Sequence, residues 1–139
     1  MASIGVIGAG SWGTALAVLL CGNGHEVTLW SIIEDEVHTL QTKRENPDKL
    51  PGVKLPEKIE VTSDLEKAVS GKQVLVLAVP SPYVRSTAHT MKPYVAEGQI
   101  IVNVAKGIEE DSLKTLSQVI EEEIPQALVA VMSGPSHAE

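Results

Sequence analysis

The sequence predicts a doubly wound α/β domain with a mainly parallel sheet, and three observations favour this fold. Apolar, β-branched runs alternate with segments of helical periodicity along all 139 residues. The runs are nearly continuous in apolar character, which is typical of strands buried on both faces of a parallel sheet. Capping residues and prolines stand where several of the helical segments begin. We therefore expect one domain over residues 1–139, long enough to bury a sizeable core.

Five apolar runs are expected to form strands, and a weaker one is expected to form a sixth. The five strong runs are Ile4–Ile7, Val27–Trp30, Val74–Val79, Ile100–Val104 and Leu128–Met132, and the weaker one is Ile59–Thr62. Five helices are expected between them, at Ser11–Asn23, Glu34–Glu45, Asp64–Ser70, Pro82–Lys92 and Leu113–Glu123. The irregular stretch from Asn46 to Lys58 carries three prolines, and we expect it to be an ordered excursion over the surface.

Local signals mark three of the helix starts. Ser63 with Glu66 three residues later has the spacing of a capping box. Ser81 stands as a cap before Pro82, and Ser112 can cap the last helix. That last helix is expected to place its apolar residues on one face; these are Leu113, Leu116, Val119 and Ile120.

Composition limits the function. The formal net charge is −7, which argues against nucleic acid or an anionic membrane as a partner, because both require a basic surface. A small anion remains possible, since backbone amides and one lysine can bind it locally. Cys21 is the only cysteine. No apolar run is long enough to cross a bilayer, and no basic segment precedes the first apolar run as it would in a signal peptide. We expect a cytoplasmic protein without a disulfide or membrane insertion, and no metal-ligand spacing is present.

The strongest local motif is the glycine loop in "IGVIGAGSWGTALA". Gly8, Gly10 and Gly13 have the spacing G-x-G-x-x-G, with a predicted strand before them and a predicted helix after them. In a Rossmann-type domain the first glycine makes the tight turn, the second lets a pyrophosphate approach, and the third lets helix and strand pack closely. The motif predicts dinucleotide binding, and the alternative is a glycine-rich turn without a ligand.

The sequence leaves the choice between NAD and NADP open. NAD-binding domains commonly carry an acid at the end of the second strand, and NADP-binding domains an arginine nearby. Here the region reads Trp30-Ser31-Ile32-Ile33-Glu34, with neither residue at the strand end. Basic residues further on, Lys43, Arg44 and Lys49, either reach the cofactor or form a solvated basic face; the second is the more common arrangement.

Several motifs in order resemble the N-terminal domain of soluble, bacterial-type NAD(P)-dependent glycerol-3-phosphate dehydrogenase. They are "GAGSWGTALA", "NPDKLPGVKLP", "AVPS", "AKGIE" and "SGPSHAE", and the resemblance spans essentially the whole chain. The resemblance implies an oxidoreductase that interconverts sn-glycerol 3-phosphate and dihydroxyacetone phosphate with NAD(P)H, for phospholipid synthesis. By this resemblance the cofactor residues would be Gly8, Gly10, Ser11, Trp12, Gly13, Ile32, Ile33, Lys106 and Ala138, and the substrate residues Lys106, Gly134 and Ser136.

The chain departs from the family pattern at two positions. Ile32 stands where family members often carry arginine or histidine, and Lys49 replaces the tyrosine of the "NPxYLPG" pattern. Independently of the family, Lys106 follows a predicted strand at the edge where ligands bind in open α/β sheets, so it can place a positive charge on a phosphate. The structural alternative is a surface lysine. Trp30 and His25 are expected to be structural.

The resemblance also implies that the sequence is cut short before a helical second domain that supplies the general acid/base lysine. No catalytic residue is then expected in these 139 residues, which should have little activity alone. An apolar interdomain surface would be exposed, so we expect self-association into a homo-oligomer. Two alternatives are the cofactor domain of another two-domain dehydrogenase, acting on a β-hydroxy or keto acid, and a non-enzymatic dinucleotide-sensing module.

Overall fold

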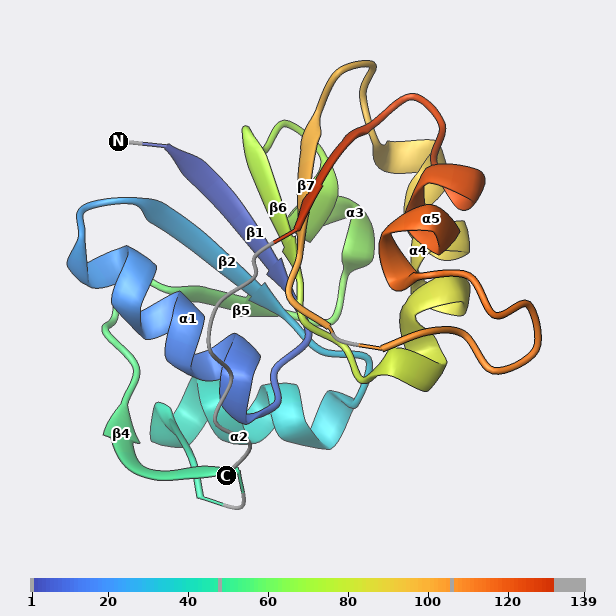
Figure 1. The fold of residues 1–139 in the computed structure, drawn as a ribbon. Helices are drawn as coiled ribbons and strands as arrows, with labels where there is room; N and C mark the ends of the chain where they lie inside the picture. The colour runs from blue at the N-terminus through green and yellow to red at the C-terminus, as the bar shows by residue number, and fades with distance from the viewer. Residues whose placement is uncertain (1, 48, 106, 132–139) are drawn as a thin grey trace.

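Six parallel strands form the central sheet in the order β5-β2-β1-β6-β7-β8 (Figure 1). The structure is a computed structural model that describes residues 2–47, 49–105 and 107–131. The strands are β1 (Ser3–Ile7), β2 (Glu26–Trp30), β5 (Glu60–Thr62), β6 (Val74–Leu77), β7 (Ile100–Asn103) and β8 (Leu128–Val131). All six predicted strands are confirmed to within two residues, apart from Met132, which lies outside the described residues. The chain builds outward from β1 in one direction and then from β6 in the other, so the predicted doubly wound topology is confirmed.

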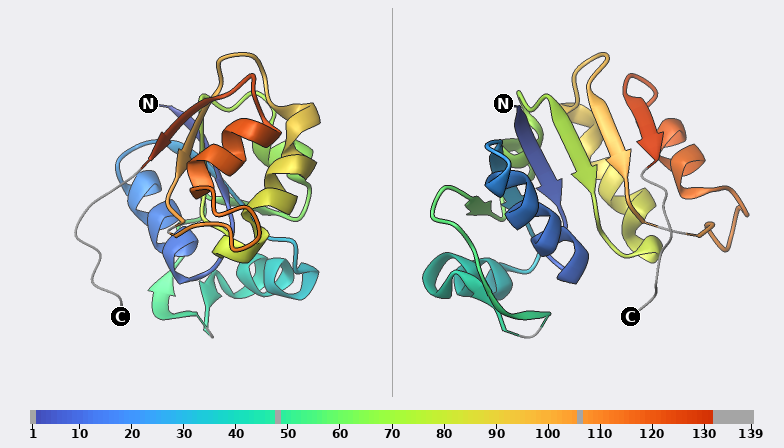
Figure 2. Two further views of the ribbon diagram at one scale, coloured as in Figure 1. Left: turned by 45° about the vertical axis from the view of Figure 1, so that its right-hand side comes forward. Right: turned by 60° about the vertical axis from the view of Figure 1, so that its left-hand side comes forward.

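Helices cover both faces of this sheet (Figure 2). Helices α1 and α2 pack on one face, and α3, α4 and α5 pack on the other. Their bounds are α1 Ser11–Gly22, α2 Glu34–Lys43, α3 Leu65–Val69, α4 Val84–Met91 and α5 Leu116–Glu123, with short 3-10 helices η1 (Ser81–Tyr83) and η2 (Lys92–Tyr94) on either side of α4.

The two helical layers explain why the strands are apolar without alternation. Successive strand residues point to opposite faces, so Val6 packs in the α1–α2 core and Ile7 in the α3–α5 core. Both are fully buried, and Val76 and Leu77 repeat the arrangement in β6. A strand covered on both faces has no polar side, as the sequence pattern indicated.

Three predicted helix caps are wrong by one to three residues; they are Ser63, Ser81 and Ser112. The cap of α3 is Asp64, whose carboxylate accepts hydrogen bonds from the backbone amides of Glu66 and Lys67. It displaces Ser63 because Asp64 is the residue with extended backbone angles just before the helix. Similarly, η1 begins at Ser81, but Pro80 occupies the capping position and no side chain caps it.

The last helix begins at Leu116 rather than at the predicted Leu113. Thr115 caps it, and Gln118 reciprocates in a complete capping box. Leu113 instead has a positive φ of 61° and is 71% exposed, so its predicted place on the apolar helix face is wrong. The cause is a bridge between Ile108 and Thr115, which closes the preceding loop and keeps it out of the helix.

The described residues of the surface excursion after α2 form regular structure, as expected. Its strands β3 (Glu45–Asn46) and β4 (Leu50–Lys54) pair antiparallel. Arg44 fixes its base, because the guanidinium donates from Nη2 to the carbonyl oxygens of Pro56 (2.5 Å) and Ile59 (2.7 Å). The reading of Arg44 as part of a solvated basic face is therefore wrong; it is a structural residue.

Trp30 and His25 have structural roles, as expected. Trp30 is 6% exposed, and its indole Nε1 donates to the carbonyl oxygen of Ser63 at 3.0 Å. His25 accepts a hydrogen bond from the backbone amide of Ala2 at its Nδ1 (3.0 Å), which ties the first strand to the turn before β2.

Gly5 in β1 lets helix α3 approach the sheet closely. A Cβ atom at this position would lie 2.0 Å from the carbonyl oxygen of Ala68 and 3.0 Å from Leu75. Both neighbours belong to the packed core, so neither has room to move away. The glycine is required here by packing rather than by its backbone angles.

We predict that Gly5→Ala lowers the free energy of unfolding by about 1–3 kcal/mol, the usual range for overpacking a core. Urea unfolding followed by circular dichroism measures this. Gly22→Ala is the matched control, because a Cβ there meets no atom within 4 Å. It should be neutral or slightly stabilising at the end of α1. Equal stability of the two variants would contradict the packing argument.

Candidate functional site: the edge at the glycine loop

The parallel strands all end at the same edge of the sheet, and backbone hydrogen bonds join the ends of β1, β2, β6 and β7 there. The amide of Gly8 donates to the carbonyl oxygen of Trp30 (2.9 Å), which joins the ends of β1 and β2. The amide of Ala78 donates to Ile7 (2.8 Å), and that of Val104 to Leu77 (3.1 Å). This edge includes the point between β1 and β6 where the strand order reverses, and ligands of open α/β sheets bind at such a point.

The three glycines of the loop have distinct physical roles. Gly8 has a φ of +118°, and a Cβ there would lie 2.8 Å from the backbone of Ala78. A Cβ on Gly13 would lie 1.9 Å from the carbonyl oxygen of Gly8, so this residue sets the contact between helix and turn. Gly10 differs, because a Cβ there would meet nothing within 4 Å. The middle glycine therefore faces open space, where the sequence analysis expected the pyrophosphate.

The N-terminus of α1 is suited to an anion. Gly10 is its capping residue and supplies no side chain, and α1 carries no acid in its first turn. The first amides of a helix lack internal partners and carry a partial positive charge. Ser11 and Trp12 follow at the surface, and Trp12 is 58% exposed. The residues present thus fit a dinucleotide phosphate.

The excursion after α2 forms a wall beside the glycine loop. Asn46 is buried, and its Nδ2 donates to the carbonyl oxygen of Ala9 at 3.0 Å. The Ser11 hydroxyl donates to the carbonyl oxygen of Lys49 at 2.5 Å, and the Lys49 amide donates to the Asn46 side chain at 3.2 Å. These contacts hold the "NPDKLPG" stretch against the loop, a role that the sequence analysis did not assign.

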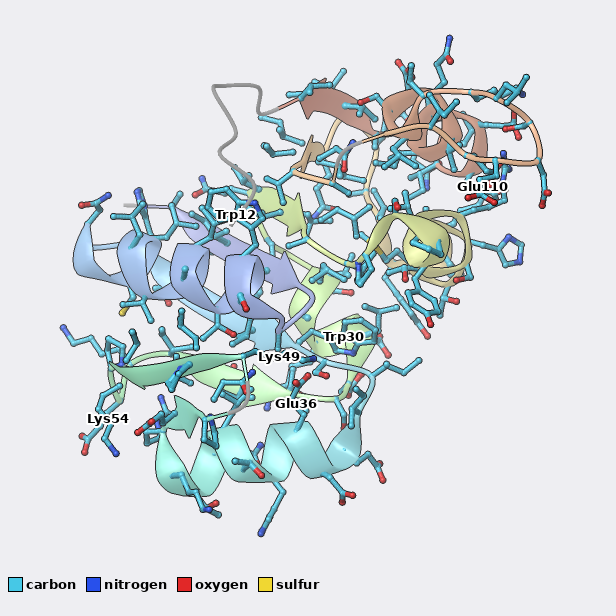
Figure 3. The ribbon with its side chains drawn as sticks, turned by 60° about the horizontal axis from the view of Figure 1, so that its bottom comes forward. Trp12, Trp30, Glu36, Lys49, Lys54 and Glu110 are labelled. Atoms are coloured by element: carbon cyan, nitrogen blue, oxygen red, sulfur yellow. The ribbon has the colours of Figure 1, made fainter. Side chains whose placement is uncertain are left out.

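A carboxylate also lies at the end of β2, although the sequence places none there. Glu36 comes from the first turn of α2, and its Oε1 accepts a hydrogen bond from the Ser31 hydroxyl at 2.7 Å. Its other oxygen pairs with the Lys49 ammonium at 2.8 Å, so Glu36 and Lys49 lie together between α2 and α1 (Figure 3). The expectation that this strand end lacks an acid is therefore wrong, because the fold brings Glu36 there from α2. The sequence pattern shows neither the contact of Glu36 with Ser31, five residues away, nor its contact with Lys49, 13 residues away.

Beside this pair lies a hollow of about 290 Å³ between α2 and the excursion. Its lining residues are Ile33, Asp35, Glu36, Thr39, Leu40, Asn46, Pro47 and Lys49. Ile32 and Ile33, the expected ribose-facing residues, are 77% and 51% exposed at the start of α2. Two large apolar side chains in water at this edge are available to pack against a ligand.

The end of β7 leads toward the remaining predicted residues. Asn103 is 2% exposed, and its Oδ1 accepts a hydrogen bond from the amide of Ala105 at 3.0 Å, which turns the chain after the strand. Gly107 follows with a φ of +107°. The other predicted site residues, Lys106, Gly134, Ser136 and Ala138, lie outside the described residues.

An ion network fixes the segment after Gly107 onto α4 and α5. Arg85 of α4 contacts Glu109 through both Nε (2.7 Å) and Nη2 (2.9 Å), and Nη1 contacts Glu122 and Glu123 at 2.7 Å each. The Ser112 hydroxyl also donates to Glu109 at 2.6 Å. Three carboxylates around one guanidinium join three segments of the chain.

These contacts shift the ionisation of the network. The Arg85 guanidinium, helped by the Ser112 hydroxyl, lowers the pKa of Glu109 to about 2. The pKa of Glu123 is lowered by Arg85 and then by His89, and that of Glu122 by Lys114 and then by Arg85. The three carboxylates raise the pKa of Arg85 in turn. Arg85 and its three carboxylate partners are thus charged at neutral pH.

Within residues 2–47, 49–105 and 107–131, no helix is both long and apolar enough to span a bilayer. In the same stretches, no three His, Cys, Asp or Glu side chains are grouped so that they could bind a metal ion.

A parallel doubly wound sheet, a glycine turn at its switch point and an uncapped helix N-terminus together define a Rossmann-type dinucleotide-binding domain. The particular family follows from comparison of the sequences. The profile of the family described as "NAD-dependent glycerol-3-phosphate dehydrogenase N-terminus" matches residues 3–139, and the chain belongs to this family.

Relatives and solved structures agree with this. The chain is 60% identical over its whole length to a glycerol-3-phosphate dehydrogenase (NAD(P)+) of Agathobacter rectalis and 42% identical to one of Bacillus subtilis, spanning 41% of each. It also matches a crystal structure of glycerol-3-phosphate dehydrogenase from Coxiella burnetii, with a TM-score of 0.90 and 35% identity over 98% of this chain and 42% of that one. The chain thus spans about two fifths of the relatives it matches.

We predict that the stabilisation from Glu109 disappears in acid. Its pKa is lowered from 4.5 to about 2 in the folded chain, so folding favours the ionised form. The contribution is complete above pH 4.5 and is lost as the pH falls through that value toward about 2. Urea unfolding of the wild type and Glu109→Gln across this range measures it as a stability difference that shrinks with falling pH.

Glu110→Gln is the control, because Glu110 is an exposed neighbouring acid and the change removes the same charge. Its difference from the wild type should vary less with pH. A constant difference between the wild type and Glu109→Gln at every pH would mean that the ion pair does not stabilise the fold.

Proposed function

We propose that this chain is the NAD(P)H-binding half of an enzyme that interconverts sn-glycerol 3-phosphate and dihydroxyacetone phosphate. The observation that carries the proposal is the open N-terminus of α1, where Gly10 faces empty space at the sheet's switch point. Membership of the family supports the reaction and its two substrates. The enzyme would act in the cytoplasm and supply glycerol 3-phosphate for phospholipid synthesis.

The described residues support the cofactor half of this proposal. The amides at the start of α1 would bind the pyrophosphate, with Gly8 and Gly13 holding the turn beneath it. Trp12 would lie along the dinucleotide, and Ile32 and Ile33 would face its adenosine half. When bound, the nicotinamide donates or accepts the hydride. The chain's own contribution is to fix the cofactor at the edge of the sheet.

The substrate half of the proposal rests on residues outside the described ranges. Lys106 would place a positive charge on the substrate phosphate or its oxygen, and Gly134 and Ser136 would hold the substrate. Asn103 and Gly107 support the role of Lys106, because they turn the chain on either side of it at the carboxyl end of β7. The general acid/base would come from the part of the relatives that this chain does not span, so little turnover is expected from the chain alone.

Neither alternative function is favoured. A ketopantoate reductase from Ralstonia eutropha has a TM-score of 0.71 to this chain, but its 22% identity supports the shared fold alone. A non-enzymatic sensing module would have no need of the family's "KG" and "SGPS" motifs, which the chain carries at Lys106–Gly107 and Ser133–Ser136.

We predict saturable binding of NADH or NADPH by the 139-residue chain. Quenching of tryptophan fluorescence and energy transfer to the nicotinamide would report it, chiefly from Trp12, which is exposed, rather than from the buried Trp30. Gly10→Glu should weaken binding by about tenfold or more, since it places a negative side chain in the space for the pyrophosphate.

Gly10→Glu should leave the free energy of unfolding nearly unchanged, because a Cβ at this position has open space around it. Loss of binding with intact folding would locate the cofactor at the glycine loop. Unaltered cofactor binding by this variant would rule out the proposed site. Repeating the titration with any longer product of the gene would reveal what its additional residues contribute.

We also propose that the chain associates with a second copy through the sheet face over β7 and β8. Strand residues Val74, Ile100 and Leu128 are in register in β6, β7 and β8, and in a parallel sheet they point to the same face. Ile100 is 40% exposed and Leu128 is 60% exposed. Among the described residues no helix lies over this part of the face; α1 and α2 cover the other strands (Figure 2, right). Association would remove these side chains from water.

We predict that sedimentation of the chain detects dimers that grow with concentration, and that Leu128→Lys reduces them. The lysine places a charge in the middle of the apolar face, where pairing would have to bury it. Lys92→Leu is the control: it removes a charge and adds an apolar side chain at an exposed position on the other side of the sheet. A purely monomeric profile of the wild type at high concentration would rule out this association.

A further inference from the structure

The side chains of Ser31, Glu36 and Lys49 form a cluster directly after β2, and we call it the β2 clasp. In doubly wound domains the end of the second strand is the place where the adenosine ribose of a dinucleotide binds. NAD carries a free 2′-hydroxyl there, and NADP carries a 2′-phosphate. The chemistry of the clasp therefore bears on which cofactor this chain accepts, and the argument rests on the dinucleotide binding proposed above.

We infer that Glu36 is a specificity-determining residue that favours NADH over NADPH. Its side chain is 14% exposed, so the carboxylate is held in place and partly shielded from water. A ribose hydroxyl can donate a hydrogen bond to a carboxylate, whereas a 2′-phosphate brings two further negative charges toward it. The same group is thus a hydrogen-bond partner for one cofactor and a repulsive charge for the other.

The cation of the clasp does not offset this repulsion. Lys49 Nζ already pairs with Glu36 at 2.8 Å, and its carbonyl and amide are held by Ser11 and Asn46. A phosphate would therefore have to share this ammonium with the Glu36 carboxylate, which weakens the attraction that Lys49 can offer it. Arg44, the nearest arginine in sequence, is committed to the carbonyl oxygens at the base of the excursion.

Ser31 offers little to a phosphate either. Its hydroxyl proton is directed to Glu36 at 2.7 Å, and its oxygen accepts from the amide of Ile33 at 3.1 Å. Ser31 is 4% exposed, so the hydroxyl is fixed in this role. Ile32 and Ile33 add apolar surface without charge. The acids Glu34 and Asp35 stand in the same first turn of α2, which makes the local field more negative.

The test is to measure dissociation constants for NADH and NADPH by fluorescence titration, a reading that does not depend on turnover. The wild-type chain should bind NADH on the order of tenfold more tightly than NADPH. Glu36→Gln keeps the shape and removes the charge, which also releases Lys49. We expect NADPH affinity to rise by about tenfold, while NADH affinity changes by less than about threefold.

Two further variants separate the charge of the clasp from general effects. Adding Lys49→Met to Glu36→Gln should reduce the gain in NADPH affinity to the part that comes from removing the Glu36 charge, because the freed ammonium is then absent. Glu34→Gln removes the same charge from an exposed position in the same turn of α2 and should change the ratio by less than about twofold. An effect of Glu34→Gln as large as that of Glu36→Gln would overturn the specific role of Glu36.

The inference also fails if the wild type prefers NADPH, or if Glu36→Gln binds both nucleotides with an unchanged ratio. Either result would leave the proposed cofactor site intact, because both nucleotides would still bind. Absence of saturable binding of both nucleotides by the wild type, in the printed chain and in any longer gene product, would overturn the proposed function and this inference with it.

Discussion

The contact between the Gly8 turn and its neighbours is the constraint on which the site depends. The backbone of Gly8 touches that of Ala78 at the end of β6, and Gly13 of α1 lies directly on the Gly8 carbonyl. No side chain fits at either point, so three backbone segments meet without an intervening layer. This brings the N-terminus of α1 over the gap between β1 and β6, where its partial positive charge faces the ligand edge. Gly10 is then free to leave that space open.

Around this backbone contact, the rest of the edge is built from long-range polar contacts. Asn46 and Lys49 hold the excursion against the glycine loop, and Glu36 reaches the end of β2 from the next helix. The excursion therefore links the two places that a dinucleotide must contact, its pyrophosphate and its adenosine ribose. A change in cofactor preference would need a change in this wall, because the strand ends themselves are set by the core.

The segment after Gly107, at the β7 end of this edge, is held by ion pairs rather than by close packing. Arg85 gathers Glu109, Glu122 and Glu123, and so fixes the segment after Gly107 to α4 and α5. Because these groups lie at the surface, solvent and salt weaken each pair, but a bidentate contact within a network holds its geometry better than an isolated pair. Asn103 thus turns the chain after β7, and Arg85 anchors the segment that follows Gly107.

The sequence alone determined the strands, the order of strands and helices, the doubly wound class and the glycine loop, since each depends on periodicity or on residues within a few positions. Helix starts were predicted less accurately. Asp64 and Thr115 are the caps in place of Ser63 and Ser112, because capping residues that lie close together in the sequence compete, and the backbone of the preceding loop decides between them. Only the tertiary structure placed Glu36, Asn46 and Arg85. Their partners lie five to 38 residues away in the chain, and no local pattern encodes which of many polar side chains will meet once the sheet has formed.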